Sequence, residues 1–193
     1  MTRATFTIAV VFLCIAAAAP EVTFVSPCEC VGFHGKNRWV AKTDLTPVPS
    51  DTSAIQSVTP SQIYAWEGLG PDVDLTRYTE ERMPSEQKWY ALTGRVVDAK
   101  VEADGDIHIA LVDAAGNAIG TVSAEIPVGP NWCEIRQTVF GWTTQSFPFS
   151  VKTAHTLKIR EQHVITVIGK AFYDIAHAPA DHSNRRMDRI LFD

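Results

Sequence analysis

The chain lacks the short motifs that mark the commonest enzyme classes. None of the patterns GxSxG, GxxxxGK[ST], HExxH or GxGxxG occurs in its 193 residues. These patterns carry the serine nucleophile, the phosphate-binding loop, the zinc-binding helix and the dinucleotide-binding turn. The sequence therefore offers no nucleophile and base that can be paired by motif.

Strong charge of one sign is also absent. The 17 Lys and Arg residues stand against 22 Asp and Glu residues, which gives a formal net charge of −5. This balance provides no strong signal for binding nucleic acid or an anionic membrane. Hydrophobic residues make up 46% and charged residues 20% of the chain, a globular composition that excludes a wholly disordered chain or a fibre.

Long hydrophobic runs are missing apart from one at the N-terminus. Residues 1–19 contain one Arg, an apolar stretch from Phe6 to Ile15, and a run of small residues. This order is typical of a cleavable secretory signal, and the apolar stretch is short for a membrane span. We expect an exported protein, secreted or periplasmic, with no membrane association after cleavage. An uncleaved N-terminal anchor is the alternative.

Cysteine is scarce, and Cys28, Cys30 and Cys133 follow the predicted signal. Export to an oxidising compartment favours a disulfide. A bridge between Cys28 and Cys30 would be strained, so we expect Cys133 to pair with Cys30 or Cys28. Such a bridge would close a loop of roughly 100 residues and stabilise the fold by about 2–5 kcal/mol. A zinc site is the rival interpretation.

Residues 20–88 read as an irregular N-terminal arm with the Cys pair, a short strand and a linker. The strand is expected at Arg38 to Lys42. Thr59-Pro60-Ser61 could open a short helix through Gln62 to Glu67. The rest of 44–88 is rich in Pro, Ser, Thr and Asp.

Residues 89–193 show clearer periodicity and are expected to form the main domain. Strands are predicted at 89–102, with a bulge or bend at Gly94, and then at 106–113 and 118–127. Residues 133–142 have helical spacing, and a β-rich run over 157–178 is interrupted at Gly169. A last strand is expected at 189–193. A helix between the third and fourth strands predicts a mainly β, OB-fold-like barrel, with a β-sandwich as the competitor.

The densest polar pattern lies where the second of these strands begins. Asp104, Asp106 and His108 surround Gly105, and residues two apart on a strand share a face. Carboxylate oxygen and imidazole nitrogen together suit a divalent transition metal. A polar hairpin turn with no ligand is the alternative.

Further candidate residues lie on other segments. Glu125 ends the third strand, where it either approaches His108 or sits at the opposite rim, and it is a candidate general base. Asp174 and His177 are additional candidate metal ligands. The candidate anion or ligand contacts are Arg38, His182, Asn184, Arg185 and Arg186.

Two function classes follow. The first is an exported OB-fold-like module that binds an unknown small ligand or oligomer, with a divalent metal as the candidate cofactor. The second is a metal-dependent hydrolase resembling a phosphodiesterase or nuclease, in which Asp106, His108 and Asp174 or His177 hold the ion. Arg185 or Arg186 would then neutralise a phosphate.

Five stretches together resemble a group of exported bacterial proteins of uncharacterised function. They are RWVAKT at 38–43, PSE at 84–86, KVEADGDIH at 100–108, AEIP at 124–127 and FYD at 172–174. The resemblance implies no activity. Those proteins tend to end in a strand with Glu-(Ile/Leu)-His-Pro, whereas this chain reads Arg189 to Asp193 there. Asp104-Gly105-Asp106 is also similar, by analogy, to staphylococcal-nuclease-like OB domains, which place carboxylates around calcium.

Overall fold

The computed structural model describes residues 21–29, 34–69, 73–116, 120–175 and 191–192. Several sequence predictions fall outside these ranges: the signal peptide over 1–19 and the residues Cys30, His177, His182, Asn184, Arg185 and Arg186. None of the helices in the described part of the chain has the length and hydrophobicity that a bilayer-spanning helix needs.

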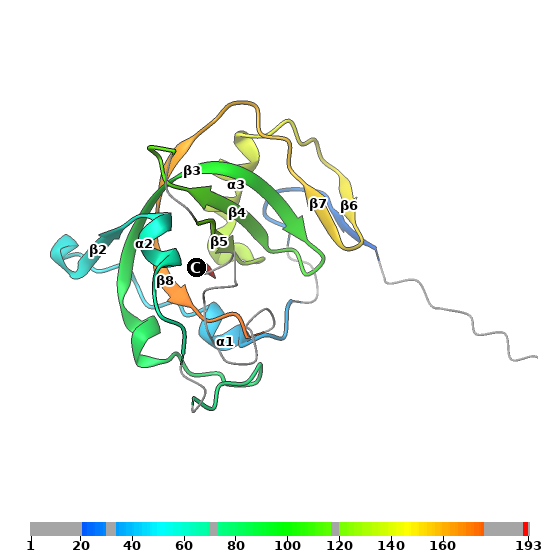
Figure 1. The fold of residues 1–193 in the computed structure, drawn as a ribbon. Coiled ribbons are helices and arrows are strands. Elements are labelled where there is room, and N and C mark those ends of the chain that lie inside the picture. Colours follow the sequence, from blue (N-terminus) through cyan, green and yellow to red (C-terminus); the bar gives the residue numbers. More distant parts are fainter. Residues whose placement is uncertain (1–20, 30–33, 70–72, 117–119, 176–190, 193) are drawn as a thin grey trace, which may run out of the picture.

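The described residues form a mainly β fold with a few short helices (Figure 1). The strands are β1 (Val22–Phe24), β2 (Ile55–Val58), β3 (Trp89–Glu102), β4 (Ile107–Val112), β5 (Val122–Ile126), β6 (Phe149–Val151), β7 (Ala154–Thr156), β8 (Val164–Phe172) and β9 (Leu191–Phe192). The α-helices are α1 (Trp39–Lys42), α2 (Pro60–Tyr64) and α3 (Cys133–Gly141), and the 3₁₀ turns are η1 (Thr52–Ala54), η2 (Pro84–Gln87) and η3 (Pro130–Trp132).

The long strand β3 organises one mixed sheet. It pairs antiparallel with β4, β7 and β8 and parallel with β2. Strand β4 pairs antiparallel with β5, and β9 contacts β5 in parallel and β8 in antiparallel orientation, through two residues each. Strands β1 and β6 form a separate pair, which lies beside β7 at one end of β3 (Figure 1).

The hydrophobic core consists largely of buried side chains from the strands of this sheet. Alternation along β4 buries Ile107, Ile109 and Leu111, as the sequence predicts. Helix α3 adds Val139 and Phe140 to the same core cluster. The predicted helix over 133–142 is thus confirmed.

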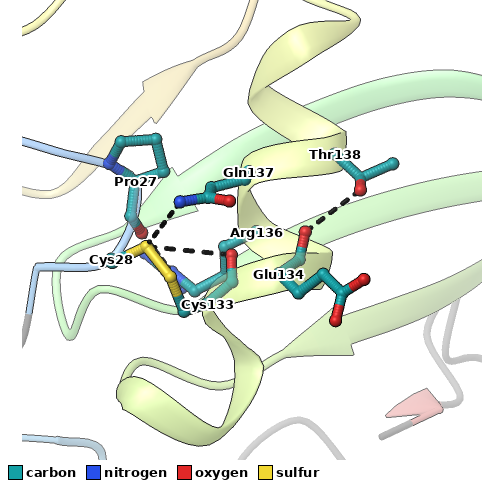
Figure 2. Close-up of a disulfide and its surroundings, with 7 residues drawn as sticks. All are labelled: Pro27, Cys28, Cys133, Glu134, Arg136, Gln137 and Thr138. Atoms are coloured by element: carbon teal, nitrogen blue, oxygen red, sulfur yellow. Dashed lines mark hydrogen bonds between the residues drawn. A yellow bond between two sulfur atoms is a disulfide. The ribbon is translucent and has the colours of Figure 1, made fainter.

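The disulfide prediction is also confirmed, with Cys28 as the partner of Cys133. Figure 2 shows it at the first residue of α3, where Gln137 Nε2 donates to Cys28 Sγ. Next to it the buried Arg136 donates from Nε to the carbonyl oxygen of Pro27 at 2.9 Å (Figure 2). The bridge and this hydrogen bond hold the segment after β1 against α3.

The segment expected to be an irregular arm is more regular than predicted. Strand β2 extends the main sheet, and α2 carries a capping box between Thr59 and Gln62. The prediction of a strand at Arg38 to Lys42 is wrong, because Arg38 adopts a left-handed conformation with φ of 49° and the next residues form α1.

Two glycine predictions are also wrong. The register shift in β3 lies between Val96 and Asp98, not at Gly94. Gly94 instead allows a close approach, because an added Cβ would lie 2.9 Å from the Val112 carbonyl oxygen and 3.0 Å from Pro60 Cγ. Strand β8 continues through Gly169, which pairs with Tyr90.

Candidate functional site

A polar cavity of about 420 Å³ is the strongest candidate site. It collects side chains from the α1 region, the β3–β4 turn, β4, β5 and the segment that follows β8. Its lining consists of Gly35, Lys36, Asn37, Lys42, Arg77, Lys100, Glu102, Ala103, Asp104, His108, Glu125, Thr153, Phe172 and Asp174. Segments that are far apart in the sequence therefore meet here, and most of the lining is charged or polar.

A buried arginine fixes the helix that delivers Lys42. Arg38, at the start of α1, donates from Nη1 and Nη2 to the two oxygens of Glu86 at 2.6 and 2.7 Å. Glu86 also accepts from the Tyr173 and Met83 backbone N–H groups. This one carboxylate thus ties α1 to the turn at 83 and to the residue before Asp174.

Lys42 stands between two buried carboxylates. Its Nζ donates to Asp106 and to Glu125, and all three residues are buried. The other oxygen of Asp106 accepts from the Val128 backbone N–H at 2.8 Å. The ammonium group therefore occupies the place between two carboxylates that a metal ion would take.

His108 extends this cluster and lines the same cavity. It lies opposite Glu125 in the β4–β5 register, and its Nε2 is 3.1 Å from Glu125 Oε1. Its Nδ1 is 3.4 Å from Glu102 Oε1, and Glu102 also pairs with Lys100. The sequence placed Glu125 either beside His108 or at the opposite rim, and in the structure it lies beside His108.

Asn37 and Asp174 form a further part of the wall. Asn37 Nδ2 donates to Asp174 Oδ1 at 2.5 Å. Asp174 is buried, and it lines the same cavity as Asp104 and His108. The structure thus brings together all of the predicted site residues that it describes apart from Arg38.

Two acceptor atoms of cavity-lining residues have no hydrogen-bond partner within the part of the chain that the structure describes. Glu125 Oε2 and Asn37 Oδ1 are buried, and neither makes a hydrogen bond to any described residue. Buried polar atoms are normally satisfied, because desolvation without a compensating hydrogen bond is costly. These atoms suggest that a molecule with hydrogen-bond donors completes the wall.

The electrostatics of the cluster follow from one lysine facing two carboxylates. Burial alone would lower the pKa of Lys42, but Glu125 and Asp106 outweigh it and raise this pKa above its usual value. Burial raises the pKa of Asp106 to about 7, with Lys42 opposing and Glu125 adding to the rise. Burial also opposes ionisation of Glu125, yet the hydrogen bond from His108 and the charge of Lys42 lower its pKa to about 2.

The predicted metal ligands are differently arranged from what a metal centre needs. Within the described ranges, no group of three His, Cys, Asp or Glu side chains is placed to hold an ion. The physical reason is Lys42, which uses one oxygen of Asp106 and one of Glu125. His177 lies outside the described residues, so its contribution stays a prediction.

Arg38 does not have the predicted role of contacting an anion. Its guanidinium is fully buried, bound to Glu86 and to the carbonyl oxygens of Thr79 and Glu81. The neighbouring Trp39 stacks on His34, with ring centroids 3.9 Å apart. Arg38 therefore positions α1.

Sequence reasoning missed Lys42, Asn37 and Glu86 as parts of this arrangement. Lys42 and Glu86 belong to the stretches that carry the family resemblance, which was the available signal. Helix α1, which carries Lys42, follows the left-handed residue Arg38, and no local pattern indicates this conformation.

Comparison with known proteins adds no assignment to this geometry. No protein-family model matches the chain, and neither curated proteins nor solved structures give a significant match. The cavity must therefore be interpreted from its own chemistry.

Proposed function

We propose that this chain is an exported binding module of OB-fold type that holds a small polar ligand in the cavity around Glu125. The observation that carries the proposal is the buried Glu125 Oε2, which makes no hydrogen bond to any described residue although Glu125 lines a cavity of about 420 Å³. Asn37 Oδ1, in the same wall, is a second acceptor of this kind.

The OB-type arrangement is supported by the order of strand pairing. Strands β3, β4 and β5 pair in sequence, β9 lies between β5 and β8, and β8 returns to β3. The parallel pair is β5 with β9, and α3 lies between the third and fourth of these strands. A meander, a helix and a returning strand are the features that favoured this fold on the sequence.

Export is supported by the Cys28–Cys133 bridge, since disulfides persist in oxidising compartments. The predicted signal at 1–19 agrees with that environment. We therefore propose that the ligand is met outside the cytoplasm.

The class of ligand follows from the lining. Four acidic side chains, Glu102, Asp104, Glu125 and Asp174, and four basic ones, Lys36, Lys42, Arg77 and Lys100, give a wall without a dominant charge. Such a wall favours a zwitterion or a polyhydroxyl compound over a polyanion. Glu125 Oε2 and Asn37 Oδ1 are acceptors, so the ligand must supply N–H or O–H donors to these two atoms.

The proposal also rests on the cost of this cluster. A buried Lys with two carboxylates is commonly no more stable than apolar residues of the same volume. A fold that needed stability alone would gain little from placing Lys42, Asp106 and Glu125 in its interior. Ligand recognition gives these charges a purpose.

Thermal melting with a defined set of compounds tests the proposal. The set contains monosaccharides and amino acids, with Mg²⁺, Ca²⁺ and Zn²⁺ as separate arms for the hydrolase alternative. We expect a saturable rise in melting temperature with a monosaccharide or an amino acid, since a ligand at 100 times its Kd adds about 2.7 kcal/mol.

The matched variants are Glu125→Gln and Glu161→Gln. Glu161 is exposed and does not line the cavity, so its variant should bind as the parent protein does. Glu125→Gln keeps the shape of the side chain but replaces one of its two acceptor oxygens with an NH₂ donor. Ligand binding should therefore weaken at least about tenfold. If neither organic class shifts the melting temperature, or if Glu125→Gln binds equally well, the cavity is not the binding site.

A further inference from the structure

The Lys42 cluster contains the two reactants of an amide bond. Lys42 carries a primary amine, and Asp106, 64 positions further along the chain, carries a carboxyl group. Lys42 Nζ donates to Asp106 Oδ2, so the nitrogen lies next to Cγ, the carbon to which that oxygen is bonded. Glu125 contacts the same nitrogen. An amine, a carboxyl group and a base therefore meet at one point.

The three side chains meet where water hardly reaches. The exposed fraction of the side chain is 8% for Lys42, 0% for Asp106 and 3% for Glu125. In water, an amine and a carboxylic acid stay apart as ions at neutral pH. Burial removes the hydration that stabilises those ions, and fixed positions remove the entropic cost of bringing the groups together. The chain neighbours of the cluster are buried and apolar: Ala41, Ile107, Ala124 and Ile126.

The hydrogen bonds give the two carboxyl groups different roles. Asp106 Oδ1 accepts from the Val128 backbone N–H at 2.8 Å. When a nucleophile attacks Cγ, negative charge develops on this oxygen, and an N–H donor already in place stabilises it. Glu125 Oε2 has no such donor within the described part of the chain. The geometry therefore favours Asp106 as the group that is attacked and Glu125 as the base.

The protonation states agree with these roles. Burial favours the neutral acid form of Asp106 and raises its pKa to about 7. At Glu125 burial acts in the same direction, but the hydrogen bond from His108 and the charge of Lys42 outweigh it and lower the pKa to about 2. A neutral carboxylic acid is the better electrophile, and an ionised carboxylate is able to accept a proton.

We propose that Lys42 and Asp106 form an intramolecular isopeptide bond, with Glu125 as the base that promotes it. Glu125 takes one proton from the Lys42 ammonium group, and the free amine then attacks Asp106 Cγ. The bond between Nζ and Cγ forms, and the bond between Cγ and Oδ2 breaks.

The atoms and charges of this step balance without an added reagent. Oδ2 leaves as water, carrying its own hydrogen and one more from the nitrogen. The amide keeps one hydrogen, and Glu125 holds the proton that it took. A cation and an anion thus become a neutral amide and a neutral acid. His108 Nε2, 3.1 Å from Glu125 Oε1, is placed to receive the proton from that acid.

The bond joins α1 to the residue that precedes β4. A cross-link of this kind restricts the unfolded chain as a disulfide does, but a reducing agent does not cleave it. The side chains of Lys42 and Asp106 are separate in the described structure, so their charges and the titration of Asp106 belong to the form that precedes the bond. Glu125 and Asn37 line the cavity in both forms. The bond therefore does not depend on the ligand proposed above.

Mass spectrometry of the purified and reduced protein tests the proposal. We expect a mass lower by one water molecule than that of the same chain without the bond. Trypsin does not cleave after a lysine whose side-chain nitrogen is part of an amide. Peptide 39–77 should therefore be recovered joined to peptide 101–136, and fragmentation should place the branch between Lys42 and Asp106.

Three variants of the site separate the roles. Asp106→Ala removes the attacked carbon and should show no loss of mass. Asp106→Asn should lose ammonia instead of water, because the amide nitrogen then leaves in place of Oδ2. Glu125→Gln keeps the side-chain shape without the base, and it should show no loss of mass.

Asp98→Ala is the matched control, because Asp98 is exposed on β3, and this variant should lose water as the parent does. The Cys28–Cys133 disulfide, read before reduction, reports that each variant has folded.

An unchanged mass in the folded parent protein would overturn the proposal, and so would a loss of water that persists in Asp106→Ala. A branch at Glu125 would overturn the choice of Asp106, and an undiminished loss of water in Glu125→Gln would overturn the role of Glu125 as the base. The mass is measured without any ligand, whereas the cavity is tested by melting with added compounds. Either proposal can therefore fail alone.

Discussion

Lys42 determines the character of the polar cluster at the scale of single residues. It neutralises one of two buried carboxylates and leaves the pair with one excess negative charge when both are ionised. A metal ion would bind the same oxygens with a higher charge, but it can dissociate. The ammonium group of Lys42 is covalently part of the protein and cannot. This explains how Asp106 and Glu125 stay close together in the described structure.

Removing this ammonium should destabilise the protein strongly. Lys42→Met keeps most of the side-chain volume but leaves Asp106 and Glu125 buried without their cation. Breaking a buried ion pair by removing one partner typically costs about 3–5 kcal/mol. Urea denaturation at neutral pH should show a loss of this size in the free energy of unfolding.

Lys88→Met is the control for that measurement, because Lys88 is exposed. Its effect should stay within about 0.5 kcal/mol. A loss below about 1 kcal/mol for Lys42→Met would mean that solvent reaches the two carboxylates.

At the scale of secondary-structure elements, the short helix α1 depends on the pair Arg38–Glu86. Helix α1 spans Trp39–Lys42, too short to be stable by its own hydrogen bonds. Arg38 also lies over the ring of Phe172 at 5.0 Å from its centroid. Long-range contacts of one arginine thus hold the element that carries Lys42.

Glu86→Gln should therefore weaken both the fold and the site. The amide removes the charge that compensates the fully buried guanidinium, and we expect a loss of about 3–5 kcal/mol in unfolding free energy. Thermal melting gives the measurement, with Glu81→Gln as the control. The Glu81 side chain is exposed and only its carbonyl oxygen binds Arg38, so Glu81→Gln should melt as the parent does. Equal melting of the two variants would contradict the anchoring role.

How far the sequence predicts each element depends on how local its cause is. The alternation in β4 and the helical spacing in α3 predict both elements, since each repeats a pattern over several residues. Helix α1 and the short strands β1, β6 and β7 were not predicted, because they exist through contacts with distant segments. At Gly94, sequence shows a glycine but not the neighbours Pro60 and Val112 that require one.

The candidate site divides in the same way. Asp106 and His108 lie two apart before and within one strand, so a local rule places them together. Glu125 joins them through the β4–β5 register, which the predicted meander allows but does not fix. Lys42 arrives from another part of the chain, and a metal was predicted where this lysine lies.

At the scale of the whole molecule, the charged cluster should make stability depend on pH near neutrality. Asp106 has a pKa raised from its ordinary 3.8 to about 7, chiefly by burial. The folded state therefore holds this proton more tightly than the unfolded state, and the free energy of unfolding falls as pH rises from about 4 through about 7. The slope is at most about 1.4 kcal/mol per pH unit.

Glu125 has the opposite sign on the acid side. Its pKa is lowered from 4.5 to about 2, so its contribution is present above about 4.5 and is lost as pH falls toward 2. Asp44, whose pKa the hydrogen bond from Lys170 helps to lower to about 2, adds a loss in the same range. Together these groups predict greatest stability near pH 4 to 5 and a decline toward neutral pH.

Urea denaturation at about pH 4.5, 6.0 and 7.5, values that span the titration of Asp106, measures this decline. Asp106→Asn should abolish the loss between the first and last of these values, because the amide does not titrate. Asp98→Asn, at an exposed position of β3, should keep it. If stability rises toward neutral pH in the parent protein, Asp106 is ionised throughout, and Lys42 must then balance both carboxylates with help from His108, whose Nε2 lies 3.1 Å from Glu125 Oε1.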